Sequence, residues 1–155
     1  STCFGTPVTL IRLNYANEPR YGILVDLTLK ILHDEPIDLT MGSVNLIWQG
    51  DANNYIIQAL GQAASPPAIL NVTGPETLRV RDMAERIGRV LGKESRFASQ
   101  EAATALLSNA SKCVERFGGP TVSLDEMIDR IATWVAAGKP VLNKPTKYNV
   151  RDGRF

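Results

Sequence analysis

Hydrophobic positions along the chain follow two spacings, and these predict the order of the secondary-structure elements. Two short runs of mostly aliphatic and β-branched residues, 7–13 and 68–72, are largely apolar on both faces, which is typical of buried strands in a parallel sheet. The stretch 37–49 predicts one or two short strands with a bend at Gly42. Apolar residues at three- and four-residue steps predict helices over 21–35, 51–60, 80–91, 101–117 and 123–137.

Local signals predict where several of these helices begin and end. Asp51 is placed to cap the second helix, and Ser123 with Glu126 forms the spacing of a capping box at the start of the last helix. Gly92 is expected to end the third helix. Trp134 falls on the apolar stripe of the last helix, so we expect it in the core.

The order of strand, helix, short strands, helix, strand and three helices predicts an α/β fold. Two buried parallel strands make a poor sheet by themselves, because parallel strands are normally covered on both faces and have neighbouring strands. The chain has 155 residues, the length of one domain, and begins with Ser1 rather than Met. We therefore expect the rest of the sheet to lie upstream of Ser1.

Composition and charge exclude several classes of protein. Hydrophobic residues make up 44% of the chain and charged residues 21%, which is typical of a globular domain. A net charge of +1 lacks the basic excess of a nucleic-acid-binding protein. The apolar runs are shorter than the roughly 20 residues of a membrane span, and no signal-peptide pattern is present. Cys3 and Cys113 form no disulfide framework, so we expect a soluble protein of the cytoplasm.

The residues that carry common chemistries are sparse. His33 lies at the end of an apolar helix, where a capping or surface role is expected, and neither Cys3 nor Cys113 has a histidine nearby in sequence. We therefore expect no metal site. The Gly118-Gly119 pair follows a helix and precedes Pro120, unlike a phosphate-binding loop, which leads from a strand into a helix. No tyrosine is followed four residues later by lysine, so we assign no catalytic residue.

Several segments, taken together and in order, resemble one protein family. Residues 7–12 form an apolar strand that ends in Arg, and Pro-Arg follows at 19–20. Residues 47–52 read as a strand end followed by Asp and Ala, 71–74 as a strand that ends in Asn-Val-x-Gly, and 80–92 as a helix that ends in Leu-Gly. This series resembles the carboxyl-terminal part of the extended short-chain dehydrogenases, the NAD-dependent epimerase/dehydratase family.

The resemblance implies both a fold and an activity. The fold would be the last two strands of a doubly wound parallel sheet plus the small helical substrate-binding subdomain, over residues 1–155. The Rossmann half, with its glycine-rich loop and Tyr-x-x-x-Lys pair, would precede Ser1. The parent would be an epimerase, dehydratase or reductase that transfers a hydride between NAD or NADP and a small-molecule substrate. Alone, the chain would be inactive, bind neither cofactor tightly and self-associate through an exposed sheet edge.

The resemblance also suggests site residues. The loop after the first strand would contact the nicotinamide end of the cofactor, through Asn14 and Tyr15. Val44 stands where nucleotide-sugar members often carry Arg, so Arg151 becomes the candidate for a positive charge toward a phosphate or carboxylate. The expected substrate-binding residues are Arg20, Asn45, Trp48 and Arg151.

Each substrate-binding candidate has a structural alternative. Arg20 would lie on the surface at a helix start, Asn45 in a turn, Trp48 in the core, and Arg151 in a solvated tail. The whole chain has an alternative as well. It would be a free-standing module of the same ancestry, which folds as a monomer and binds a small anion or a protein partner.

Overall fold

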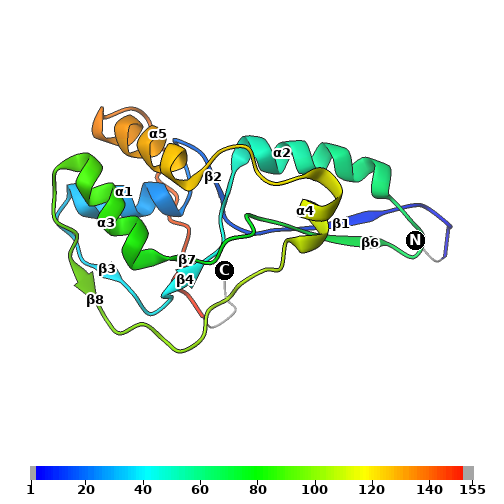
Figure 1. Ribbon diagram of the computed structural model, residues 1–155, viewed down its shortest axis with the longest axis horizontal. Coiled ribbons are helices and arrows are strands. Elements are labelled where there is room, and N and C mark those ends of the chain that lie inside the picture. The colour runs from blue at the N-terminus through cyan, green and yellow to red at the C-terminus, as the bar shows by residue number, and fades with distance from the viewer. Residues whose placement is uncertain (1–2, 152–155) are drawn as a thin grey trace. The chain divides into compact units, whose positions relative to one another are not determined.

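The structure is a computed structural model that describes residues 3–151, and its ribbon is shown in Figure 1. The chain divides into two compact units, each built from three separate stretches of sequence. The first unit contains residues 3–16, 45–76 and 108–121. The second contains residues 17–44, 77–107 and 122–151. Residues 152–155 of the predicted solvated tail lie outside the described residues.

The first unit is built on a parallel pair of strands, as predicted. β1 (Thr9–Leu13) pairs with β6 (Ala68–Val72), with Ile11 opposite Leu70. α2 (Gln49–Gln58) runs along this pair, as Figure 1 shows, and α4 (Ser111–Phe117) also packs against β6. The 3₁₀ helix Ala59–Gln62 continues α2. The buried core between these elements consists of Ile47, Ala52, Tyr55, Ala59, Leu70, Val72 and Cys113.

The opposite face of the strand pair remains open, so the prediction that both strands are buried on both faces was wrong. Leu10 and Ile69 are directly paired across the two strands and are 47% and 42% exposed. Side chains alternate between the faces of a strand, and only the face that carries Ile11 packs on the helices. The first unit therefore presents to solvent a sheet face that carries the apolar pair of Leu10 and Ile69 beside the polar pair of Arg12 and Asn71.

The second unit is built on three helices that pack against one another pairwise. These are α1 (Ile23–Leu32), α3 (Val80–Leu91) and α5 (Leu124–Ala136), which Figure 1 labels. Their facing residues recur at three- and four-residue steps, as in Ile23, Leu27 and Ile31, which are all fully buried or nearly so. The helical periodicity of the sequence thus predicted this core correctly.

Short strands brace the same unit. β3 (Ile37–Asp38) pairs in parallel with β8 (Phe97–Ala98), and β4 (Ser43–Val44) pairs antiparallel with β7 (Leu78–Arg79). β2 (Ala16–Asn17) lies at a boundary between the units in the sequence, since Ala16 belongs to the first unit and Asn17 to the second. Short strands were expected between 37 and 49, but the stretch holds three rather than one or two, since β5 (Ile47–Trp48) of the first unit follows β3 and β4.

Two of the local capping signals are confirmed. Ser123 Oγ accepts a hydrogen bond from the Glu126 amide, and the Glu126 carboxylate accepts one from the Ser123 amide, which completes the capping box. Gly92 ends α3 with a φ of 64°, in the left-handed region that glycine adopts without strain.

Three expectations about the helices were wrong. α2 begins at Gln49 with Trp48 in the cap position, and Asp51 in its first turn accepts a hydrogen bond from Thr121 Oγ1 at 2.7 Å. The helix expected over 101–117 forms only from Ser111. Trp134 is half-buried rather than in the core, because its Nε1 donates to the Pro140 carbonyl and thus turns toward the chain that follows α5.

Candidate functional site

The carboxyl ends of β1 and β6 lie at the same edge of the first unit, because the strands are parallel. This edge is where α/β sheets usually bind ligands. The Asn14 amide donates to the Val72 carbonyl at 3.0 Å and so extends the pairing by one residue. Tyr15 then turns the chain with a φ of +42°, an uncommon conformation for a residue other than glycine. The Tyr15 carbonyl accepts from the Ile47 amide at 3.2 Å, which holds this turn in place.

Thr73 and Gly74 form the other side of the same edge. Thr73 is fully buried, and its Oγ1 has no hydrogen-bond partner among the described residues. A buried hydroxyl without a partner costs about 1–3 kcal/mol, so proteins usually avoid one. A Cβ on Gly74 would lie 2.2 Å from the Leu46 carbonyl oxygen, so only glycine allows the two backbones to approach this closely. Backbone contact and an unsatisfied hydroxyl thus mark this edge.

Asn45 holds two loops of the first unit together. It is 3% exposed, its Nδ2 donates to the Glu76 carbonyl at 2.9 Å, and its Oδ1 accepts from the Ser108 amide at 2.8 Å. Both ends of the amide are therefore already bonded to backbone. Trp48, at the start of α2, is half-buried, with its indole packed beside Gly50.

The two arginine candidates belong to the second unit and have partners there. The side chain of Arg20 is 55% exposed, and its Nε donates to both carboxylate oxygens of Glu18 at 3.0 and 3.1 Å. Arg151 donates from Nη1 to the Thr104 carbonyl at 2.7 Å and from Nη2 to Thr104 Oγ1 at 2.5 Å. Arg20 is thus ion-paired, while the bonds of Arg151 to Thr104 are to neutral groups.

The structure thus divides the six candidates between the two units. Asn14 and Tyr15 lie at the carboxyl edge, and Asn45 and Trp48 flank Ile47, whose amide bonds to that edge. Sequence reasoning missed Thr73, although the position was visible. It is the first polar residue after an apolar strand and directly precedes a glycine.

Titratable groups of the first unit with shifted pKa values lie in the core, away from this edge. Burial, with the charge of Asp51 nearby, raises the pKa of Tyr55, whose hydroxyl donates to the Gly118 carbonyl. Burial also raises the pKa of the Cys113 thiol, so this cysteine is a poor nucleophile. The edge itself offers amide, hydroxyl and backbone groups, which can hold a ligand by hydrogen bonds.

Two searches of the described residues bear on metals and membranes. Within residues 3–151, His, Cys, Asp and Glu side chains form no group of three or more that could hold a metal ion. Over the same stretch, the structure contains no helix long and apolar enough to cross a membrane.

The fold is that of the carboxyl-terminal part of Rossmann-type epimerases, which confirms the resemblance seen in the sequence at the level of the fold. The UDP-glucuronic acid 4-epimerase of Bacillus cereus, solved with NAD, superposes with a TM-score of 0.69 at 17% identity. The UDP-glucose 4-epimerase of Thermotoga maritima, solved with UDP-glucose, gives 0.66 at 16% identity. The enzyme WbmF of Bordetella bronchiseptica, solved with NAD⁺ and UDP, also gives 0.66 at 16% identity.

The match covers most of this chain but less than half of each neighbour. It includes 84% of this chain and 45% of the B. cereus enzyme, 84% and 46% for the T. maritima enzyme, and 85% and 47% for WbmF. Neither the protein-family models nor the curated proteins give a match to this sequence. At such low identity the likeness defines the fold alone.

Proposed function

We propose that this chain is the carboxyl-terminal, substrate-side part of an NAD(P)-dependent epimerase, dehydratase or reductase, and that it is inactive by itself. One observation carries the proposal. The chain has the fold of less than half of a Rossmann-type epimerase and contains a two-stranded parallel sheet with one face open, on which Leu10 and Ile69 are exposed. A sheet of this kind is marginal alone and gains stability when further strands and helices complete it.

The occupant that we propose for the open face is the Rossmann half of the same protein. Leu10 and Ile69 would be buried by it, which follows the rule that parallel sheets are covered on both faces. In its absence, two copies of the chain would bury this face against each other, whereas the self-association expected from the sequence runs through an exposed sheet edge.

The described residues fit only one end of a nicotinamide cofactor. Asn14 and Tyr15 would contact its nicotinamide end from the carboxyl edge, and the buried Thr73 hydroxyl offers a further hydrogen bond there. The glycine-rich loop that cradles the pyrophosphate of a dinucleotide is not in this sequence. We therefore propose that NAD or NADP binds tightly to the parent protein and weakly or not at all to this chain.

For the substrate we propose a small molecule held by Arg20, Asn45, Trp48 and Arg151 in the parent. Asn45 would act as a positioning residue, because its amide already bonds to Glu76 and Ser108. An anionic substrate would have to compete with Glu18 for Arg20 and with Thr104 for Arg151.

The first experiment is to compare the 155-residue chain with the product of the full reading frame. We expect the frame to continue upstream into a strand–helix turn rich in glycine and a Tyr-x-x-x-Lys. Calorimetry with NAD and NADP, and light scattering, would then be run on both products. Cofactor binding by the longer protein alone, with self-association of the short chain, supports the proposal.

The opposite results would overturn it. A start codon directly before Ser1, together with a monomer that melts cooperatively and binds no cofactor, favours a free-standing binding module. Reduction of NAD by the short chain alone would contradict the claim that it is inactive.

A further inference from the structure

The segment 101–110 has a sequence that favours one conformation and a structure that shows another. It contains four alanines and two leucines, which are strong helix formers, and neither glycine nor proline. It leads directly into α4. Yet the structure contains no helix in this segment, and α4 begins only at Ser111. Local preference and observed structure rarely disagree over ten residues unless other contacts impose the result.

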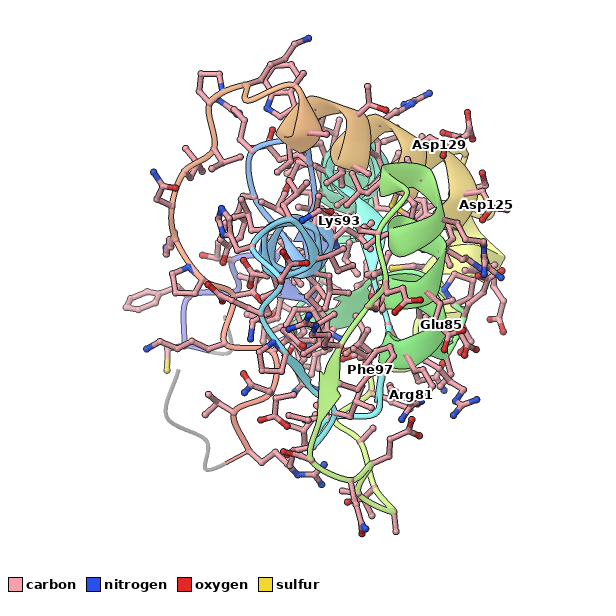
Figure 2. The ribbon with its side chains drawn as sticks, turned by 90° about the vertical axis from the view of Figure 1, so that its left-hand side faces the viewer. Arg81, Glu85, Lys93, Phe97, Asp125 and Asp129 are labelled. Atoms are coloured by element: carbon pink, nitrogen blue, oxygen red, sulfur yellow. The ribbon has the colours of Figure 1, made fainter. Side chains whose placement is uncertain are left out.

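The start of the segment is held by two arginines. The Glu101 carboxylate lies 3.3 Å from Arg79 Nη2 and 3.2 Å from Arg81 Nε. Figure 2 shows Arg81 of α3 beside Phe97, and its guanidinium lies 4.5 Å from the centre of that ring. Glu101 is thereby fixed beside β7 and α3 rather than at the start of a helix.

The groups that a helix would use are bonded elsewhere. In an α-helix the Thr104 carbonyl would accept from the Ser108 amide, four residues on. Here the Thr104 carbonyl accepts from Arg151 Nη1 at 2.7 Å, and the Ser108 amide donates to Asn45 Oδ1 at 2.8 Å.

The Leu106 amide, a second donor that a helix would use, is bonded to the sulfur of the fully buried Met41. The Met41 Sδ accepts from the Leu106 amide at 3.4 Å and lies 3.9 Å from Arg151 Nη1. We call Arg151, with its bonds to Thr104, the clamp.

Arg151 is brought to this position by residues 141–151, which we call the strap. The strap contains neither helix nor strand. The buried Tyr148 anchors it by donating to the Asp38 carbonyl at 3.4 Å, and Thr146 donates to Asp26 Oδ2 from both its amide, at 2.8 Å, and its hydroxyl, at 2.6 Å. Leu142 is 55% exposed. Segments with so few buried contacts open locally without unfolding the rest of the protein.

We propose that the strap is a conformational latch for residues 101–110. While it is docked, the clamp keeps this segment from forming a helix. When it undocks, the Thr104 carbonyl is released. The segment then folds into a helix continuous with α4, in which the Leu106 and Ser108 amides exchange their bonds to Met41 and Asn45 for helical ones. The helix would gain about ten residues and so about 15 Å of length. This proposal concerns the second unit and the entry to α4, and it does not depend on the proposed enzymatic function.

The test removes the clamp from the full 155-residue chain with Arg151→Gln. The matched control is Lys147→Gln, which removes the same charge from an exposed strap position whose side chain makes no hydrogen bond or ion pair with the described residues. Cα chemical shifts of 101–110 and the ellipticity at 222 nm would be measured for both. We expect helical shifts and a stronger helical signal in Arg151→Gln, with the control unchanged.

Two more variants make the result decisive. Tyr148→Ala removes the anchor of the strap and should produce the same helical shifts as Arg151→Gln. Adding Ala103→Gly and Ala105→Gly to Arg151→Gln should abolish them, because glycine disfavours a helix and neither change touches the clamp. The latch is overturned if residues 101–110 keep their original shifts in Arg151→Gln. Shifts that move to random-coil values, with no gain in ellipticity, overturn it equally.

Discussion

The buried hydroxyl of Thr73 leads to a prediction about stability that runs against the usual cost of a core substitution. Thr73 is fully buried, and its Oγ1 finds no partner among residues 3–151. Valine has nearly the same shape, so Thr73→Val replaces the unsatisfied hydroxyl with a methyl group. A buried polar group without a partner costs about 1–3 kcal/mol. We therefore expect Thr73→Val to raise the free energy of unfolding by about 1–2 kcal/mol.

The matched change is Thr73→Ser, which keeps the hydroxyl and removes the methyl. It should lower the free energy of unfolding by about 1 kcal/mol, because a buried methyl contributes about that much. Urea unfolding followed by tryptophan fluorescence gives both values. For a chain of this length, 1 kcal/mol corresponds to roughly 2–4 °C in melting temperature. A Thr73→Val protein less stable than the original would refute the reasoning, since it would mean that the hydroxyl is satisfied.

The same substitution carries information about the site. If the hydroxyl is retained for a ligand, the longer parent protein should become more stable and bind its cofactor less tightly in Thr73→Val. Such an exchange of stability for binding is common at functional sites. If the cofactor affinity of the parent is unchanged in Thr73→Val, the hydroxyl affects stability and has no role in binding.

Three further predictions concern other positions. Asn45→Ala should lower the free energy of unfolding by about 2 kcal/mol, because two backbone groups lose their partners. The control Asn54→Ala, on the exposed side of α2, should stay within about 0.5 kcal/mol of the original. Equal effects of the two substitutions would contradict the role of Asn45. Gly74→Ala should lower the free energy of unfolding by about 3 kcal/mol, because its Cβ would meet a backbone carbonyl oxygen at 2.2 Å. The control Gly61→Ala, where the added Cβ has open space, should leave the thermal stability unchanged or slightly raised, as measured by thermal melting. Hydrogen bonds from a neighbouring threonine lower the pKa of Asp38 from 3.8 to about 2. The stability that this carboxylate contributes is therefore present above pH 4 and lost as the pH falls toward 2, and Asp38→Asn should flatten that part of a urea-midpoint profile.

Features that depend on neighbouring residues in sequence could be predicted well. The capping box of Ser123 and Glu126 spans three residues, and the left-handed Gly92 follows directly on α3. The two apolar runs of β1 and β6 were recognised as parallel strands from their composition. Hydrophobic periodicity predicted the helices and strands, and the resemblance of segments along the chain to the epimerase/dehydratase family predicted the fold.

Features that depend on distant partners could not. Asn45 bonds to Glu76 and Ser108, which lie 31 and 63 positions away, so its type and spacing give no hint of its role. Residues 101–110 are the clearest failure. Their helical preference is genuine, and the contact that overrides it comes from Arg151, 47 positions beyond Thr104. The open sheet face was also misjudged, because an apolar strand looks the same in sequence whether both of its faces are covered or only one.

The interleaving of the two units affects how the chain can be made as well as how it is held together. α1 is synthesised well before α5, yet the two helices pack against each other. The three-helix core therefore cannot close until α5 has been synthesised. Until then, the buried faces of α1 and α3, with Ile31 and Ile87 among their residues, are exposed to solvent and to other chains. A deletion that removes α5 would consequently leave a chain that aggregates, rather than a smaller domain that folds.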